Sequence, residues 1–383
     1  MNYYDKYDWQ TMLTQHGSAT YDIAEYFDIL CPRSDYPDFL DRYIELPVLQ
    51  RLAGIGLLCG TDWTKLYRNR FYYSRLDHSK GVALIVWHFT HDKAQTIAGL
   101  LHDISTPVFS HVSDFRKGDA LTQTATEEPT ARIIRGDKAL NQLLAEDGLT
   151  AAQVEDYHIY PIADNEIPQL SADRLEYMFP SGMALDGSWT MEEIRRCYND
   201  LIILKNEDGQ DELGFRTLEI AELYCEHFCM IGHILQLNEN KLALHMLGQI
   251  MNMADKAGFL NETGFMTLSE KAVMERLDGL LRCTRNDILA RYYHTFRTMT
   301  SIEHTDHALP EDEYFCVNLK VKQRYINPLV IDPRVKPEDD TNLSLSGLTR
   351  QSVRLYDVSA KARRIIDDFK TYHDTAYGCV KLV

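Results

Sequence analysis

The chain is organised around residues 74–114, which read SRLDHSKGVALIVWHFTHDKAQTIAGLLHDISTPVFSHVSD. His78 in this stretch is followed at helical spacing by Val82, Ile85 and Phe89, the pattern of one apolar helix face. We therefore expect the His78 imidazole to point into the interior and not toward water.

A His-Asp doublet follows a second apolar stretch. His102 comes one helical turn after Ala98, and Leu101 and Ile104 flank the doublet with apolar side chains. The Asp103 carboxylate is therefore also expected inside, where an unpaired carboxylate would cost several kcal/mol of folding free energy. A divalent metal ion is the simplest partner for two imidazoles and a buried carboxylate.

Four ordered motifs resemble those of the HD-domain phosphohydrolases, in the branch of the deoxynucleoside triphosphate triphosphohydrolases. They are Arg75-Leu76-Asp77-His78, Leu101-His102-Asp103-Ile104, Phe109-Ser110-His111 and Ala172-Asp173-Arg174-Leu175-Glu176-Tyr177. The last is similar to the family's Asp-(Arg/Lys)-x-(Asp/Glu)-Tyr segment. The resemblance implies one divalent metal ion (Mn, Fe, Mg, Ni or Zn), held by His78, His102, Asp103 and Asp173.

The resemblance also implies a set of substrate contacts. His111 and Asp114 match positions that line the family's substrate site, and we expect them to be catalytic, one orienting the other. Arg75, Arg174 and Tyr177 match contacts to phosphate and sugar, and the planar fork of Arg suits phosphate oxygens. The alternatives are that His111 packs and caps a helix start, and that the arginines form ordinary salt bridges.

Two departures from the family pattern bear on activity. Thr106 and Thr126 stand where the triphosphohydrolases have histidines, and a Thr hydroxyl does not titrate near neutral pH. One hypothesis is therefore a metal-dependent phosphohydrolase acting on a nucleotide or related phosphoester. The alternative is a catalytically impaired relative that retains the metal and binds nucleotides in a regulatory role.

Composition limits the partners. The net charge is −17 over 383 residues, which argues against nucleic-acid binding but permits a locally basic pocket for a small phosphorylated substrate, with nucleotide as the expected class. No apolar run reaches the roughly 18 residues of a membrane span. The eight scattered cysteines are expected to be reduced thiols, so we predict a cytoplasmic protein; a homo-oligomer is left open. Cys225 and Cys229 suggest either a second metal site or a packed helix stripe.

The pattern along the chain predicts a mainly α fold, an HD-domain helical core with a small C-terminal α/β appendage. The boundaries are an N-terminal segment packed on the core over 1–37, the core over 38–300 and the appendage over 301–383. Asp173 is placed on a helix that ends near Phe179–Gly182, and a long helical stretch is predicted from Phe215 to Met253. In the appendage, strands are predicted over 315–321, 353–355 and 378–382, with a helix over 360–372.

Overall fold

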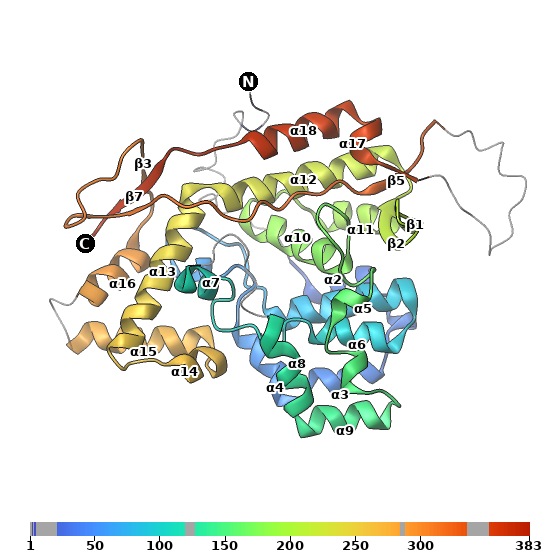
Figure 1. Ribbon diagram of the computed structural model, residues 1–383, viewed down its shortest axis with the longest axis horizontal. Coiled ribbons are helices and arrows are strands. Elements are labelled where there is room, and N and C mark those ends of the chain that lie inside the picture. The colour runs from blue at the N-terminus through green and yellow to red at the C-terminus, as the bar shows by residue number, and fades with distance from the viewer. Residues whose placement is uncertain (1, 3, 5–20, 119–126, 284–287, 335–351) are drawn as a thin grey trace, which may run out of the picture.

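The computed structural model describes residues 2, 4, 21–118, 127–283, 288–334 and 352–383. Across these residues the protein is mainly α-helical with two small sheets, which confirms the predicted fold class (Figure 1). Residues 5–20 of the predicted N-terminal segment, and Thr126, lie outside the described residues. Helix α2 (Ile23–Leu30), from the same segment, packs against the central helix α5.

Helix α5 (Arg75–Thr90) forms the centre of the fold. It begins with a capping box, in which the Ser74 side chain accepts from the Asp77 amide and the Asp77 side chain accepts from Ser74. Helices α6 (Lys93–Leu101) and α10 (Ala172–Leu185) pack on it, and residues 82–86 are buried without interruption. A helix that is apolar on all sides lies in a protein interior. His78 on this helix is buried, as its spacing predicted.

Helix α10 is longer than predicted, because it continues through Pro180 to Leu185. Proline has no N–H to donate to the carbonyl four residues earlier, which here belongs to Glu176. The Tyr26 hydroxyl from α2, whose shorter contact is with the Glu176 carboxylate at 3.0 Å, lies 3.4 Å from that carbonyl. A side chain distant in sequence thus offers a polar contact to the carbonyl that Pro180 leaves without its helical donor.

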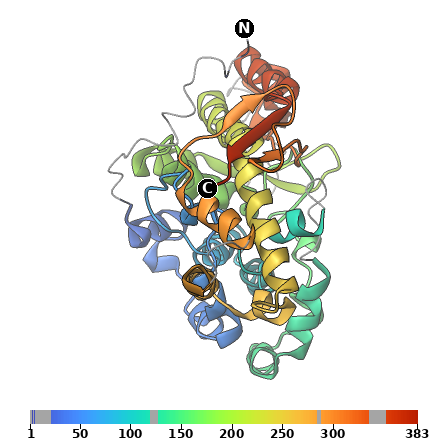
Figure 2. The same ribbon diagram turned by 90° about the vertical axis from the view of Figure 1, so that its left-hand side faces the viewer.

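The predicted stretch from Phe215 contains two helices, α12 (Leu218–Gln236) and α13 (Asn238–Lys256), separated by the extended residue Leu237. The other helices are shorter and surround this frame: α3 (Phe39–Ile44), α4 (Pro47–Gln50), α7 (Val112–Lys117), α8 (Glu127–Gly136), α9 (Lys138–Glu146), α11 (Met191–Asn199), α14 (Glu262–Thr267), α15 (Glu270–Cys283), α16 (Ile288–Thr298), α17 (Leu355–Val358) and α18 (Ala360–Thr371). Helix α18, close to its predicted range, packs along α12 at the top of both ribbon views (Figures 1 and 2).

The larger sheet joins the C-terminal region to the helical part. Its strand order is β1 (Leu201–Lys205), β2 (Asp211–Phe215), β5 (Leu329–Ile331) and β6 (Ser352–Arg354). The β1–β2 hairpin was not predicted. Strand β5 runs parallel to β2, with Gly214 opposite Leu329, and antiparallel to β6. Backbone hydrogen bonds therefore connect residues from both sides of the predicted boundary at 300.

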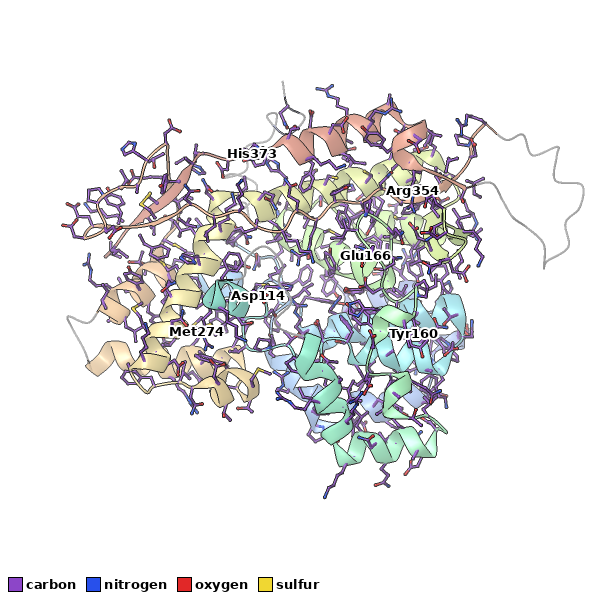
Figure 3. The ribbon with its side chains drawn as sticks, in the orientation of Figure 1. Asp114, Tyr160, Glu166, Met274, Arg354 and His373 are labelled. Atoms are coloured by element: carbon purple, nitrogen blue, oxygen red, sulfur yellow. A yellow bond between two sulfur atoms is a disulfide. The ribbon has the colours of Figure 1, made fainter. Side chains whose placement is uncertain are left out.

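An ion-pair network that runs from the buried Glu212 to the exposed Glu207 reinforces this sheet, with Arg354, labelled in Figure 3, between them. The Arg354 guanidinium donates to both oxygens of Glu212, at 2.7 and 2.9 Å, and to both oxygens of Glu207, at 2.7 Å. Glu212 is completely buried and also accepts from the Leu170 amide. Burial raises the pKa of Glu212, and the contacts with Arg354 and the Leu170 amide offset only part of that rise.

The smaller sheet has the order β3 (Glu303–Thr305), β7 (Tyr377–Lys381) and β4 (Tyr314–Val317), all antiparallel. Cys316 on β4 lies opposite Cys379 on β7, and the two form a disulfide. The prediction that all eight cysteines are reduced is wrong for this pair, because sequence spacing does not show which residues face each other across two strands.

A charged cluster holds the smaller sheet to helix α13. His304 on β3 lies between two carboxylates, with Nε2 2.9 Å from Glu239 and Nδ1 3.2 Å from Asp374. Hydrogen bonds to Asp374 and Glu239 raise the pKa of His304 to about 10. The Thr375 hydroxyl is 3.2 Å from the same Nδ1, and burial lowers the pKa of Lys241 beside these carboxylates.

Because of this cluster, the free energy of unfolding should fall as the pH rises from about 6.5 to about 10. An imidazole whose pKa is raised on folding stabilises the protein fully below its unfolded value of about 6.5 and loses that effect as pH rises through about 10. We expect His304→Gln to lower the melting temperature at pH 6 and to converge with the unmodified protein near pH 10. Thermal melts across this range, with the exposed His307→Gln as matched control, check it. A constant difference at every pH would contradict the charged-histidine interpretation.

Candidate metal centre

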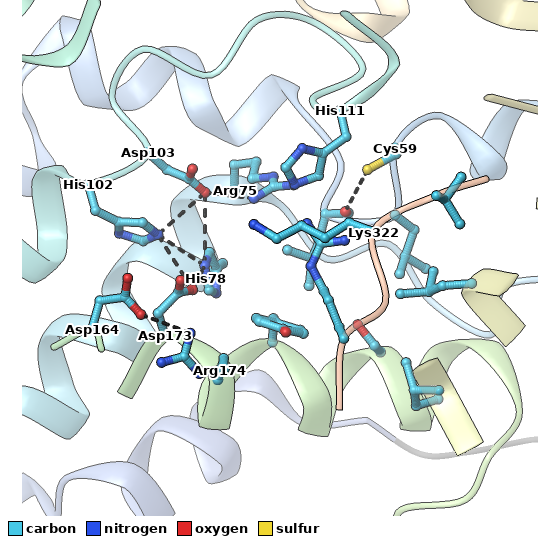
Figure 4. A pocket seen from close by; sticks show the side chains of 18 of the residues that line it. Cys59, Arg75, His78, His102, Asp103, His111, Asp164, Asp173, Arg174 and Lys322 are labelled. Carbon is cyan, nitrogen blue, oxygen red and sulfur yellow. Dashed lines mark hydrogen bonds and ion pairs between the residues drawn. The ribbon is translucent and has the colours of Figure 1, made fainter. Parts of the chain in front are cut away.

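The four predicted ligands converge on one point, although they come from three places in the chain (Figure 4). His78 is on α5, His102 and Asp103 directly follow α6, and Asp173 is in the first turn of α10. The two imidazole Nε2 atoms are 3.2 Å apart. Asp173 Oδ1 lies 3.1 Å from His78 Nε2 and 3.8 Å from His102 Nε2, and Asp103 Oδ2 lies 3.9 and 3.6 Å from the same atoms.

Both imidazoles turn Nε2 toward the other predicted ligands and Nδ1 toward an acceptor in the protein. Nδ1 of His78 is 2.5 Å from Glu176 Oε2, and Nδ1 of His102 is 2.7 Å from the Gly99 carbonyl. An acceptor at Nδ1 favours a proton on that nitrogen, so Nε2 is the atom that can bind a metal ion once it carries no proton. Because the two Nε2 atoms are in contact, both can bind the same cation.

The spacing of the donor atoms fits a metal ion. Bonds of about 2.0–2.2 Å to nitrogen and oxygen place neighbouring ligand atoms roughly 3 Å apart or slightly more, as found around His78 Nε2. The donor atoms of His78, His102 and Asp103 all lie within 4.8 Å of one another, and Asp173 completes the ring from the other side. Two neutral imidazoles and two carboxylates suit a divalent cation.

The pKa shifts at the site also indicate that positive charge stabilises the ionised carboxylates. Burial lowers the pKa of His78, but Asp173 and Glu176 raise it to about 10, so in the absence of another cation the imidazole itself becomes the cation. Burial raises the pKa of Asp173, but His78 and His102 hold it well below its usual range. A bound divalent ion would replace that proton.

Glu176 forms a buried support behind His78, a role that the sequence did not reveal. Its side chain is completely buried and accepts from the Tyr26 hydroxyl at 3.0 Å and the Tyr73 hydroxyl at 2.5 Å, besides His78. Gly81 lies one turn from His78, and a Cβ there would collide with this carboxylate. The signal was present in the Glu of the Asp-Arg-x-Glu-Tyr segment and in Gly81.

Asp103 is held by two further residues. Arg75 Nη1 donates to Asp103 Oδ2 at 2.8 Å, and the Thr106 hydroxyl donates to Asp103 Oδ1 at 2.8 Å. Burial raises the pKa of Asp103, but Arg75 and the two histidines hold it well below its usual range. Arg75 also donates to Ser110 and is buried. Arg75 and Thr106 therefore both orient a predicted ligand. Arg75 also lines the cavity, so the phosphate contact that the resemblance implied for it stays a prediction.

His111 and Asp114 lie side by side but differ in access. His111 Nδ1 is 3.0 Å from Asp114 Oδ2, and His111 lines the cavity beside the metal centre. Asp114, which Figure 3 labels on α7, is completely buried. It is not part of the cavity lining. Burial lowers the pKa of His111, with Asp114 opposing it. The geometry favours Asp114 as a positioning residue over one that contacts substrate.

Backbone strain presents His111 to the cavity. Phe109 and Ser110 have φ of 62° and 51°, a left-handed conformation that costs non-glycine residues of order 1–3 kcal/mol each. Both side chains are buried, which holds them in place. Such outliers are concentrated at functional sites, and this pair turns the chain from Asp103 toward α7.

The two remaining predicted substrate contacts, Arg174 and Tyr177, both line the cavity but differ in how they contact the rest of the protein. Arg174 lines the cavity, but its guanidinium donates to the Gln169 carbonyl at 2.8 Å and to Asn165, and lies 3.2 Å from Asp164. Those contacts favour the salt-bridging alternative for Arg174. Tyr177 lines the cavity, and burial raises its pKa to about 12, so its hydroxyl remains protonated near neutral pH.

The cavity has a volume of about 730 Å³ and contains residues that the prediction missed. Lys322 and Arg324, from the segment between β4 and β5, line it together with apolar residues such as Leu57, Phe115 and Leu244. The signal was the alternation of Lys320, Lys322 and Arg324 with Leu319 and Val321, where only the apolar half was interpreted. Lys322 and Arg324 thus give the pocket one basic wall, whereas Asp and Glu side chains line other parts of it.

A second metal site at Cys225 and Cys229 is not supported within the described parts of the chain. The groups there that bring together three potential ligand residues are the His78–His102–Asp103 cluster and the Glu239–His304–Asp374 cluster. Both cysteines are buried on α12, and their mutual hydrogen bond, with burial, raises the pKa of Cys225. The packed-stripe alternative accounts for them.

The comparisons with known proteins indicate similarity to phosphohydrolases. A metal-dependent phosphohydrolase of Cordyceps militaris, cns2, is 29% identical over 153 residues, which is 40% of this chain and 43% of that protein, so the match spans less than half of that relative. The uncharacterised protein YdhJ of Bacillus subtilis is 22% identical over 310 residues, covering 80% of this chain and 88% of YdhJ. No family model matches the chain.

Solved structures show the same fold. A phosphohydrolase from Bacteroides thetaiotaomicron has a TM-score of 0.54 at 14% identity, covering 93% of this chain and 95% of that one. A hypothetical protein from Aquifex aeolicus also has a TM-score of 0.54 at 14% identity, covering 91% of this chain and 93% of that one.

Among the described residues, no helix has both the length and the apolar character needed to cross a bilayer.

Proposed function

We propose that this protein is an HD-type metal-dependent phosphohydrolase that acts on a nucleotide or related phosphoester. The observation that carries the proposal is the convergence of two Nε2 atoms, on rings whose Nδ1 atoms face acceptors, with two carboxylates at the wall of a large, partly basic cavity. Similarity to a metal-dependent phosphohydrolase supports it. The ligands proposed are His78, His102, Asp103 and Asp173.

Different residues of the chain have different roles in the proposed hydrolysis. A divalent cation, when bound, supplies Lewis-acid activation of water and of a phosphoryl oxygen. His111 offers Nε2 to the cavity, because Asp114 engages its Nδ1, and its lowered pKa keeps it neutral near pH 7, able to accept or relay a proton. Arg75 holds Asp103 in place while Tyr177 and the apolar wall contact the remainder of the substrate.

The regulatory alternative has one observation in its favour. Thr106 occupies the position of the family histidine and uses its hydroxyl on Asp103, so it supplies no titrating group. General acid-base assistance worth about 10²- to 10⁴-fold must then come from His111 or be absent. We expect weak triphosphohydrolase activity on deoxynucleotides and less impaired hydrolysis of an aryl phosphate, whose leaving group needs little protonation.

One experiment separates the two functions. The purified protein is saturated with Mn²⁺, its metal content is measured, and hydrolysis of deoxynucleoside triphosphates, nucleoside monophosphates and p-nitrophenyl phosphate is followed. Metal-dependent turnover of any of these supports the phosphohydrolase. Stoichiometric metal with nucleotide binding but no turnover supports the regulatory alternative. A protein that binds neither metal nor nucleotide contradicts both.

A further inference from the structure

The segment between β4 and β5 forms one wall of the cavity, although it lies more than two hundred residues after His78. Val321, Lys322 and Arg324 line the cavity from this segment. Figure 4 shows the Lys322 side chain extending toward the side of the cavity where Arg75 and His111 lie. The segment therefore brings two cations to a centre whose predicted ligands are all contributed by residues 78–173.

The backbone of this segment is fixed in place along α12. Gln236 donates to the Lys322 carbonyl at 3.1 Å, and a Cβ added at Gly232 would lie 2.7 Å from the Arg324 carbonyl oxygen, so the chain passes directly over that glycine. Ile326 is completely buried, and the backbone N–H of Asn327 donates to the Pro168 carbonyl at 2.8 Å. The cations are therefore carried by an anchored backbone, which limits the entropy lost when they bind a ligand.

Two arginines on the metal side of the cavity contact carboxylates: Arg75 is 2.8 Å from Asp103 and Arg174 is 3.2 Å from Asp164. The charge of Arg324 reaches across the cavity, because it lowers the pKa of His111 in the same direction as burial and lowers the pKa of Tyr177 against the effect of burial. Positive charge from the segment thus acts on two walls of the space beside the metal centre.

We propose that Lys322 and Arg324 form an anion-binding subsite for a second phosphate group of the substrate, separate from the phosphoryl group at the metal centre. The inference rests on the proposed function and names its substrate class, a phosphoester that carries at least two phosphate groups. A planar guanidinium can bind two phosphate oxygens while the ammonium binds as a point charge. Leu57, Phe115 and Leu244 leave an apolar surface for the organic part.

The test compares ligands that differ by one phosphate. Adenosine 5′-monophosphate, adenosine 5′-diphosphate and adenosine 3′,5′-bisphosphate are titrated into the Mn²⁺-loaded protein by calorimetry, for the unmodified chain, Lys322→Gln and Arg324→Gln. We expect one of the two doubly phosphorylated ligands to bind at least about 10-fold tighter than the monophosphate, and each variant to lose about 10-fold or more of that gain. The diphosphate arm reports adjacent phosphates and the bisphosphate arm reports separated ones.

The controls separate charge from folding and from catalysis. Lys320→Gln removes an exposed cation from the same segment and should bind as the unmodified protein does. Lys322→Arg should restore affinity, and metal content should stay unchanged in all variants. Loss of the second-phosphate gain in a protein without turnover would support the subsite while removing the proposed hydrolysis. Equal binding of all three ligands, or variants that bind like the unmodified chain, would overturn the subsite.

Discussion

Asp173→Asn is expected to lose bound divalent metal and to lower metal-dependent hydrolysis by at least about 100-fold. Altering a residue that only supports a ligand costs about 10- to 100-fold in metal affinity or activity, so removing a ligand should cost more. Asp173 Oδ1 is the carboxylate oxygen nearest to His78 Nε2, at 3.1 Å, and an amide in its place has neither the charge nor the affinity for a cation. Elemental analysis after desalting, with steady-state rates, measures both quantities.

A matched control is available in the same cavity. Asp156 also lines it but is half-exposed and contacts His158, so Asp156→Asn should keep the metal. Chelation should lower the melting temperature of the unmodified protein, because an ion that binds only the native state stabilises it by mass action. The melting temperature of Asp173→Asn should not respond to chelator. Unchanged occupancy in this variant would show that Asp173 is not a ligand.

Glu176→Ala should both destabilise the fold and weaken metal binding. It removes the acceptor for His78 Nδ1 and for the Tyr26 and Tyr73 hydroxyls in a completely buried site, and breaking a buried charged pair costs about 3–5 kcal/mol of unfolding free energy. Without Glu176, His78 can carry its proton on Nε2, and metal affinity should fall by about 10- to 100-fold. Denaturant unfolding and competitive metal titration measure the two effects.

Glu176→Gln separates packing from charge. The amide keeps the volume and can accept from one tyrosine, so we expect most of the stability to return, while metal affinity stays low because the charge that fixes the His78 tautomer is absent. Tyr73→Phe, which removes a single donor, should cost about 1 kcal/mol and leave the metal in place. Wild-type metal affinity in Glu176→Ala would show that the support behind His78 is structural only.

Local patterns predicted which residues turn inward, and the structure places them so. The apolar spacing around His78 indicated a buried imidazole, and α5 is the central helix. The ordered motifs selected Asp173, which lies almost a hundred positions away, as the partner of His78. Both are properties that helical periodicity or a short motif records. That these residues bind metal stays a prediction.

Contacts between distant segments were not predictable from the same patterns. Periodicity reports that a face is buried but not what covers it, so it could not assign the Thr106 hydroxyl to Asp103 or the Tyr26 hydroxyl to the helix that contains Pro180. The β1–β2 hairpin is short, and its partner strand β5 lies far along the chain. Lys322 and Arg324 were overlooked because a basic residue beside an apolar one is typical of any exposed strand.

The parallel pairing of β2 with β5 has a consequence for how the chain reaches its folded state. Gly214 cannot meet Leu329 until more than a hundred intervening residues are available, and contacts of such long sequence separation slow folding because loop-closure entropy is lost first. The four predicted ligands all lie at or before residue 173. A growing chain can therefore bring them together well before the segment with Lys322 and Arg324 has been synthesised. In refolding from denaturant the whole chain is present from the start, and the cost of closing this long loop still delays the β2–β5 pair. We therefore expect metal binding ahead of nucleotide binding, with the late phase set by closure of this long-range strand pair.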